Sequence, residues 1–286
     1  MKRWITGARP RTLPAAVVPV AVGAAAAVGA PIDVVWWRVA AALFVSLMLQ
    51  VGVNYANDYS DGVRGTDDVR VGPTRLVASG LASPSAVKRA ALLSFAAAAV
   101  AGLAIALSTS LVLLLVGAAA IAAGWFYTGG PKPYGYLGLG EVFVFVFFGL
   151  VATAGTTYAA IESITALSLV MGCAVGSLAC ALLVINNLRD IPTDREVGKK
   201  TLAVRLGDQR TRWFYVVLIA AAFVLCGVGA IWRAPVLLGV LAVPLAIRPV
   251  RSVFGGATAG ALIPVLGETG KLQLAWGLLV TIGLAL

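Results

Sequence analysis

The feature that most constrains the fold is a series of apolar runs, each about 20 residues long. A helix of this length crosses the hydrocarbon core of a bilayer, and it satisfies its own backbone hydrogen bonds there. Only 12% of the residues are charged, against about 25% in soluble domains. The sequence therefore predicts an all-α polytopic membrane protein with about nine transmembrane helices, at residues 13–30, 36–57, 87–107, 110–128, 141–161, 164–187, 212–232, 234–250 and 270–286.

The distribution of basic residues predicts the orientation of these helices. With the N-terminus in the cytoplasm, all 22 Lys and Arg residues except Arg38 and Arg233 fall on the cytoplasmic side. This is the positive-inside pattern, and it accounts for the net charge of +10 without a nucleic-acid partner. No linker or low-complexity stretch divides the chain. We therefore expect one domain over residues 1–286, in the cell membrane, with a cytoplasmic N-terminus.

Two polar clusters end otherwise apolar segments about half a chain apart. In each, an Asn precedes an Asp by four residues, Asn57 to Asp61 and Asn186 to Asp190, and Asp194 follows after four more. On a helix this spacing stacks the side chains on one face. An ionised side chain at the bilayer centre costs about 2.5–3.5 kcal/mol. Both clusters are therefore expected at the cytoplasmic interface or in a wet cavity between helices.

The residue types limit the chemistry that these clusters can perform. The chain has no His, which removes imidazole ligands and His-based catalysis, and its three Cys lie in apolar stretches as core residues. Carboxylate and amide oxygens suit Mg²⁺ that bridges phosphates. We predict two opposed oxygen sites, each with a magnesium ion bridging one diphosphate. The basic candidates for phosphate contacts are Arg64, Arg70, Arg75, Lys132, Lys199, Lys200 and Arg205.

A lipid diphosphate, with its tail in the bilayer and its head at the cytoplasmic side, is the substrate that such a site suggests. Ionisation would release diphosphate, and the allylic cation would be sheltered in an apolar pocket. An ion transporter fits less well, because the acidic residues lie on one side instead of in mid-span. A CDP-alcohol phosphotransferase would carry a DGxxAR…GxxxDxxxD run, which the sequence lacks.

The connection after residues 110–128 is rich in Gly and Pro, which dictate a turn. Lys132 is its only basic residue, and Tyr127, Tyr134 and Tyr136 can stack on a ring or shield a cation. We assign this connection to the aromatic acceptor or to the diphosphate, and the sequence leaves both open. Glu141, at the start of the next helix, belongs either to the same site or to the helix start, where its charge interacts favourably with the helix dipole.

The first cluster resembles a motif of the UbiA superfamily of intramembrane aromatic prenyltransferases. That motif is typically NDxxDxxxD, and the string from Asn57 through Asp58 to Asp61 matches it. The last Asp arrives late, as Asp67. In the second motif, YxxxDxxxD, the two Asp positions are matched and an Asn stands in place of the Tyr.

These departures and three longer strings point to one branch of the superfamily. The strings NYANDYSDGVRGTDD, YTGGPKPYGYLGLGE and NNLRDIPTDREVGKKTLAVRLG are similar to those of the branch that prenylates 1,4-dihydroxy-2-naphthoate in menaquinone biosynthesis. The resemblance runs from the first helix through residue 207. Enzymes that act on another aromatic acceptor, such as 4-hydroxybenzoate or homogentisate, are the alternative.

The resemblance implies a nine-helix UbiA-type fold, Mg²⁺ dependence and two substrates, a polyprenyl diphosphate and an aromatic acid. The reaction implied is polyprenyl transfer to 1,4-dihydroxy-2-naphthoate, with loss of carbon dioxide and diphosphate, to give demethylmenaquinone. The implied catalytic residues are Asp61, Asp67, Asp190 and Asp194, which would hold metal together with Asn57 and Asn186. The predicted substrate contacts are Asn54, Asn57, Asp58, Arg64, Arg70, Tyr127, Lys132, Asn186, Lys199, Lys200 and Arg205, of which the resemblance implies Lys200 and Arg205 as phosphate contacts.

Overall fold

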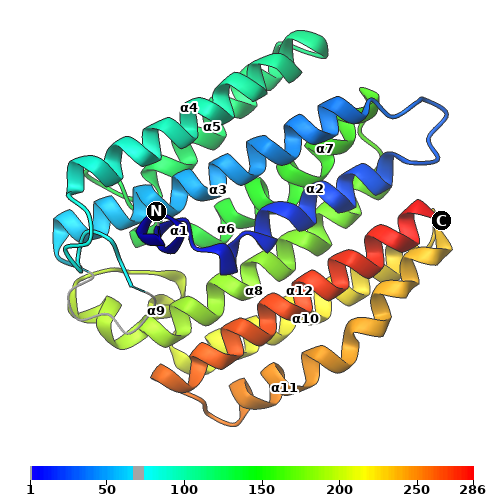
Figure 1. Ribbon diagram of the computed structural model, residues 1–286. Coiled ribbons are helices and arrows are strands. Elements are labelled where there is room, and N and C mark those ends of the chain that lie inside the picture. Colours follow the sequence, from blue (N-terminus) through cyan, green and yellow to red (C-terminus); the bar gives the residue numbers. More distant parts are fainter. Residues whose placement is uncertain (1, 67–73) are drawn as a thin grey trace.

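The computed structural model describes residues 2–66 and 74–286, and in these ranges every regular element is a helix (Figure 1). The helices run roughly side by side, so that loops gather at two ends of the bundle. The elements are α1 (Lys2–Ala8), η1 (Pro10–Thr12), α2 (Pro14–Ala27), α3 (Trp36–Arg64), α4 (Pro84–Ser108), α5 (Val112–Phe126), η2 (Tyr134–Leu137), α6 (Gly140–Val144), η3 (Phe145–Val151), α7 (Ala152–Ile161), α8 (Ala166–Glu196), α9 (Leu202–Leu206), α10 (Asp208–Gly229), η4 (Ala234–Ala242), α11 (Val243–Phe254), η5 (Ala259–Ala261) and α12 (Leu262–Ala285).

The all-helical prediction is confirmed, whereas the expected count of about nine spans is not. Among the described residues, six helical segments are long and apolar enough to cross a membrane. A seventh is obtained if the stretch from α1 to α2, bent by 53°, is one span. Helix α5 has only 15 residues. Helix α12 has 24, but Glu268 and Lys271 lower the hydropathy of its first half.

Polar side chains of α3 fix the bend that precedes α2. Arg9 adopts a left-handed φ of 52°, and Pro10 follows it, so the helix cannot continue. The Asn54 Nδ2 group donates to the carbonyl of Ala8 at 2.9 Å and to the hydroxyl of Thr12 at 3.0 Å. Asn54 is buried, and these bonds hold it against the bend between α1 and α2.

Helix α8 lies at the centre of the bundle, and most of its apolar stretch is buried among the other helices. Its two glycines, Gly172 and Gly176, form a small-residue face against which η3 packs. A Cβ atom at Gly149 would lie 2.6 Å from the Cα of Gly176 and 2.7 Å from the carbonyl oxygen of Gly172. Glycines spaced by four residues allow this close approach of helices in membranes.

The two arginines that depart from the positive-inside pattern cap helix ends at the other end of the bundle. Arg38 donates to the carbonyl of Ser108, the last residue of α4, at 2.5 Å, and forms an ion pair with Glu162 at 2.7 Å. Arg233 donates to the carbonyls of Ala25 in α2 and Leu284 in α12. Terminal carbonyls have no partner within a helix, and a cation there also complements the dipole.

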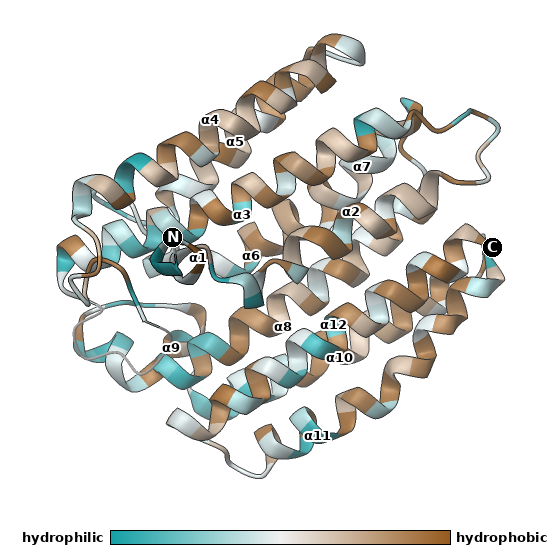
Figure 2. Cartoon of the chain, in the orientation of Figure 1, coloured by the Kyte–Doolittle hydropathy of each residue, from teal (hydrophilic) through white to brown (hydrophobic). Residues whose placement is uncertain are grey.

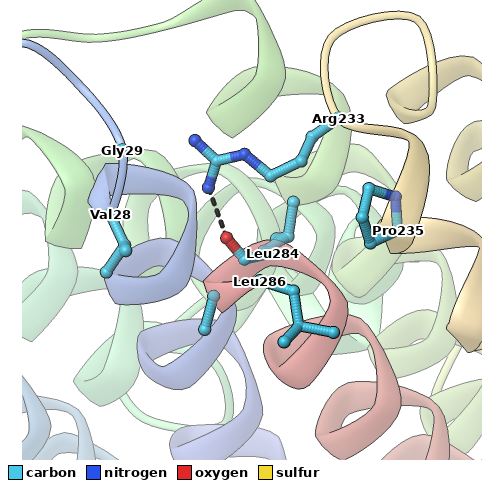
Figure 3. Close-up of a pocket in the computed structure, with 7 residues that line it drawn as sticks. Val28, Gly29, Arg233, Pro235, Leu284 and Leu286 are labelled. Atoms are coloured by element: carbon cyan, nitrogen blue, oxygen red, sulfur yellow. Dashed lines mark hydrogen bonds between the residues drawn. The ribbon is translucent and has the colours of Figure 1, made fainter.

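Arg233 also borders the cavity drawn in Figure 3, where its hydrogen bond to Leu284 is visible. Apolar side chains of α12 and of the segment after α2 make up most of the wall. This cavity is far from α9 and the polar connections, which lie at the opposite end of the bundle (Figure 1). We therefore do not assign it to the site described below.

Candidate functional site

Hydrophilic residues gather at the end of the bundle that carries α9 (Figure 2). The long helices α3 and α8 both end there, so the two polar clusters reach the same region from different parts of the chain (Figure 1). The connection between α5 and α6, residues 127–139, passes the same end. Three segments that are distant in sequence therefore supply the side chains of one site.

Asp61 is the centre of this site. It is buried in the last turns of α3, and its Oδ1 atom accepts a hydrogen bond of 2.6 Å from the hydroxyl of Tyr136. The ammonium of Lys199 lies 3.6 Å from the same oxygen, and a guanidinium nitrogen of Arg75 lies 3.8 Å from Oδ2. Side chains from α3, from the segment before α4, from the segment after α8 and from the 127–139 connection therefore meet at one carboxylate.

Tyr136 holds two cations as well as the carboxylate. The Lys199 ammonium lies 4.6 Å from the centre of the ring, and the Arg64 guanidinium carbon lies 5.5 Å from it. Both distances are within the range of cation–π attraction. Burial, followed by the charge of Asp61, raises the pKa of Tyr136, so the hydroxyl remains a donor at neutral pH.

Backbone hydrogen bonds tie the segment after α8 to this centre. The Lys199 amide donates to the carbonyl of Asp194 at 2.8 Å, and the Lys200 amide donates to the carbonyl of Tyr136 at 2.9 Å. Arg205, from α9, donates its Nε to the Lys200 carbonyl at 3.1 Å. The side chains of Lys200 and Arg205 are exposed at the rim, where a phosphate could meet them.

The other residues of the first cluster have different partners. Asn57 is buried, and its Oδ1 accepts a hydrogen bond of 2.8 Å from Thr128 in the 127–139 connection. Asp58 is fully buried, and its two oxygens accept the backbone amides of Leu76 and Val77 at 2.7 and 2.9 Å. Asp58 therefore anchors the chain before α4.

In the second cluster, Asp190 forms a two-pronged ion pair with its neighbour Arg189. The Nε and Nη2 atoms of Arg189 lie 2.6 and 2.8 Å from the two carboxylate oxygens. Both residues and Asp194 are buried. The amide of Asn186 turns back toward the Leu182 carbonyl of its own helix, at a long 3.5 Å. Residues that share this face of α8 therefore have different hydrogen-bond partners.

The remaining predicted site residues either lie outside the described ranges or have contacts of another kind. Asp67 and Arg70 belong to residues 67–73, which are outside them. Arg64 donates to the carbonyls of Thr128 and Gly130, so it holds the 127–139 connection. Lys132 is exposed, and in the ranges described no hydrogen bond or ion pair joins its side chain to the site.

Some residues of the site carry no role in the sequence analysis. Arg189 and Thr128 are among them, and so is Asn187, whose Nδ2 donates to Glu141 at 2.9 Å. For Asn187 a signal existed, because it precedes Asp190 by three residues and shares its helix face. Nothing in the sequence indicates that Thr128 pairs with Asn57, because the two residues are 71 positions apart.

The donor atoms of this site fit a hard cation. They are carboxylate oxygens of Asp61, Asp190 and Asp194 and an amide oxygen of Asn57, which is the set that Mg²⁺ prefers. Among the residues that the structure describes, no three acidic, His or Cys side chains lie close enough together to hold an ion by themselves. A metal would therefore also need ligands such as amide, phosphate or water oxygens.

Long apolar helices with buried carboxylates, amides and cations at one end define a membrane protein that acts on a polar group at the bilayer surface. Residues 16–257 match the UbiA prenyltransferase family. The chain belongs to this family, and it is a multi-pass membrane prenyltransferase. It is 52% identical over 283 residues to the 1,4-dihydroxy-2-naphthoate octaprenyltransferase of Mycobacterium tuberculosis, covering 99% of this chain and 97% of that protein.

Solved structures show the same fold at low identity. A UbiA homologue from Aeropyrum pernix superposes with a TM-score of 0.70 at 17% identity, covering 99% of this chain and 97% of that one. A second, from Archaeoglobus fulgidus, was solved with DMAPP and Mg²⁺ bound, and it superposes with a TM-score of 0.64 at 16% identity, covering 98% and 99%. The UbiA-type fold expected from the sequence is confirmed.

Proposed function

We propose that this protein transfers a polyprenyl group from polyprenyl diphosphate to 1,4-dihydroxy-2-naphthoate, with loss of carbon dioxide and diphosphate, to give demethylmenaquinol, the reduced form of demethylmenaquinone. The observation that carries the proposal is the meeting at Asp61 of Tyr136, from the 127–139 connection, and Lys199, from the segment after α8, in a chain that matches a naphthoate octaprenyltransferase over nearly its whole length. The alternative is the same transfer to another acceptor, such as 4-hydroxybenzoate or homogentisate.

We assign the diphosphate and its metal to the two clusters. The proposed metal ligands are Asn57, Asp61, Asn186, Asp190 and Asp194, together with Asp67, which lies outside the described ranges. The bound Mg²⁺ would supply positive charge that stabilises the departing diphosphate.

Cationic side chains would bind the remaining phosphate oxygens. Lys199 and Arg75 already lie within 4 Å of Asp61, so they can turn to an anionic ligand bound there. Lys200 and Arg205 are exposed at the rim, where they can bind phosphate oxygens by charge-assisted hydrogen bonds. The apolar faces of the helices would exclude water from the carbon that is transferred.

The reaction class explains why such a site needs no nucleophilic side chain. The bond between the prenyl carbon and the diphosphate oxygen breaks, and its electron pair leaves with diphosphate. The ring carbon that bears the carboxylate then bonds to the prenyl carbon. The electrons of the ring–carboxylate bond restore the aromatic ring as carbon dioxide leaves.

The test offers each aromatic acid in turn to the purified protein, with a polyprenyl diphosphate and Mg²⁺, with and without EDTA. We expect prenylated product and carbon dioxide from 1,4-dihydroxy-2-naphthoate in the presence of Mg²⁺ only. Prenylation of 4-hydroxybenzoate in its place would move the protein to the alternative branch. Turnover that survives EDTA would contradict the role given to the acidic clusters.

We further propose that the N-terminus and the diphosphate site face the cytoplasm, in the cell membrane. The basis is the excess of Lys and Arg at this end. The two exceptions, Arg38 and Arg233, cap helices at the other end. A cysteine in place of Arg195, an exposed residue in the last turn of α8, should react with an impermeant maleimide only in inverted vesicles. A cysteine in place of Ile164, which is 56% exposed before α8, should react only in right-side-out ones. The reverse pattern would overturn the orientation.

A further inference from the structure

Glu141 is a buried carboxylate that the diphosphate site does not use. It lies in the first turn of α6 and is only 4% exposed. Its Oε1 atom accepts the hydrogen bond from Asn187. Its Oε2 atom is buried and has no hydrogen-bond partner in the described part of the chain. A position at a helix start accounts for a negative charge, but it does not account for an unpaired buried oxygen, which costs free energy.

The pair formed by Glu141 and Asn187 lies next to the site, on its apolar side. Asn187, Asp190 and Asp194 are spaced by three and four residues, so they share one face of α8. A rise of about 1.5 Å per residue places Asn187 about 4.5 Å before Asp190 along the helix axis. Because α8 ends at Glu196 at the polar end, Asn187 lies deeper in the bundle than either Asp.

Tyr127 connects this pair with both clusters. A Cβ atom at Gly140 would lie 3.5 Å from the Tyr127 hydroxyl, which places that ring against the start of α6. Burial first, and then the charges of Glu141, Tyr134, Asp61 and Asp194, raise the pKa of Tyr127. Tyr127 thus lies beside the Glu141–Asn187 pair.

We propose that Glu141 and Asn187 bind the aromatic acceptor, with Oε2 of Glu141 accepting a hydrogen bond from a ring hydroxyl. This rests on the proposed function, because a phenolic hydroxyl is the donor that the oxygen lacks. Diphosphate at the clusters and a tail in the bilayer place the transferred carbon on the apolar side of Asp61 and Asp190. Glu141 lies on that side, and a hydrogen bond from a hydroxyl to a carboxylate makes the ring more electron-rich.

Asn187 acts as a positioning residue in this arrangement. Its bond to Oε1 leaves Oε2 as the oxygen that faces the ligand. Protein atoms enclose Oε2 in this conformation, so binding requires a neighbouring side chain to move. Tyr127 is half-buried and belongs to the 127–139 connection, and it is the side chain that we expect to change rotamer.

Glu141→Gln tests the contact directly. Because Asn187 donates to Oε1, the amide oxygen of the glutamine would stay there, and its NH₂ group would replace Oε2. An acceptor of hydrogen bonds would thus become a donor. We expect KM for dihydroxynaphthoate to rise about 10- to 100-fold, the loss typical of a hydrogen bond to a charged group. We expect the KM for polyprenyl diphosphate and its Mg²⁺-dependent binding to change less than about twofold.

Two controls make the result specific. Glu196→Gln removes the same charge from an exposed position at the end of α8 and should leave both KM values unchanged. Inhibition by 2-naphthoate, which has no ring hydroxyl, should be equally weak in wild type and in Glu141→Gln. An unchanged KM for dihydroxynaphthoate in Glu141→Gln, or an equal rise for both substrates, would overturn the assignment.

Asn187→Leu keeps the carboxylate and removes only the group that orients it. We expect the same selective rise in KM for the acceptor, smaller than in Glu141→Gln, with diphosphate binding preserved and the melting temperature lowered, because Oε1 loses its partner. If neither variant shows a selective rise in KM for the acceptor, the proposal is contradicted, even where one of the two folds poorly. Failure of the proposed function is distinguishable, because wild type itself would then not prenylate dihydroxynaphthoate.

Discussion

Asp61→Asn is expected to lower kcat by a factor on the order of 10²–10³ or more, the size of effect seen when one group that stabilises a transition state is removed. The amide oxygen can still accept the hydrogen bond from Tyr136, so the local geometry is kept. The variant loses the negative charge that would hold a metal and that now lies 3.6 Å from Lys199. Steady-state assays at saturating Mg²⁺ measure the effect.

The matched control for this variant is Asp33→Asn. Asp33 is exposed in the connection between α2 and α3, at the other end of the bundle. The Asp33→Asn variant should retain wild-type turnover. If Asp61→Asn keeps more than about a tenth of wild-type kcat while Mg²⁺-dependent diphosphate binding is intact, the metal-diphosphate role of Asp61 is wrong.

Asp190→Asn is expected to lose turnover and also to unfold more easily, unlike Asp61→Asn. The Arg189 side chain is 2% exposed and bonds to both oxygens of Asp190. Removing one partner of a buried ion pair typically costs about 3–5 kcal/mol, because the other charge stays buried. The cations near Asp61 lie at 3.6 and 3.8 Å, so the looser contacts there contribute less. Melting temperatures in detergent compare the two variants.

A double variant separates the two effects at Asp190. Replacing both Arg189 and Asp190 by Leu removes the pair together, and apolar replacements of a whole buried ion pair are often neutral or stabilising. We expect the melting temperature to return toward wild type while turnover stays lost. Recovery of turnover would show that Asp190 serves the fold only. A melting temperature as low as that of Asp190→Asn would contradict the energetic role of the pair.

The sequence predicted which residue types form the site better than it predicted their partners. Asp61, Asp190 and Asp194 are buried near the ends of α3 and α8. Asn54 and Asp58 belong to the same strings, yet they hold backbone segments at Ala8 and at residues 76–77. A motif records that a position is polar, but it does not distinguish a side chain that faces a ligand from one that faces the scaffold.

Periodicity and hydropathy are properties of one segment at a time, so they predicted the features of this protein that depend on single segments. They established the helical class, the membrane setting and the placement of the acidic clusters at helix ends. The number of spans was less certain, because α5 is short and α12 carries charges in its first half.

Only the tertiary structure decided which distant groups meet. The Tyr136–Asp61 bond joins residues 75 positions apart, and the Glu141–Asn187 bond joins residues 46 apart. The caps made by Arg38 and Arg233 span 70 and 208 positions. These pairings depend on how helices pack and on where each connection returns to the bundle. No repeat or spacing within one helix carries that information, because the free energy of each contact comes from a partner on another element.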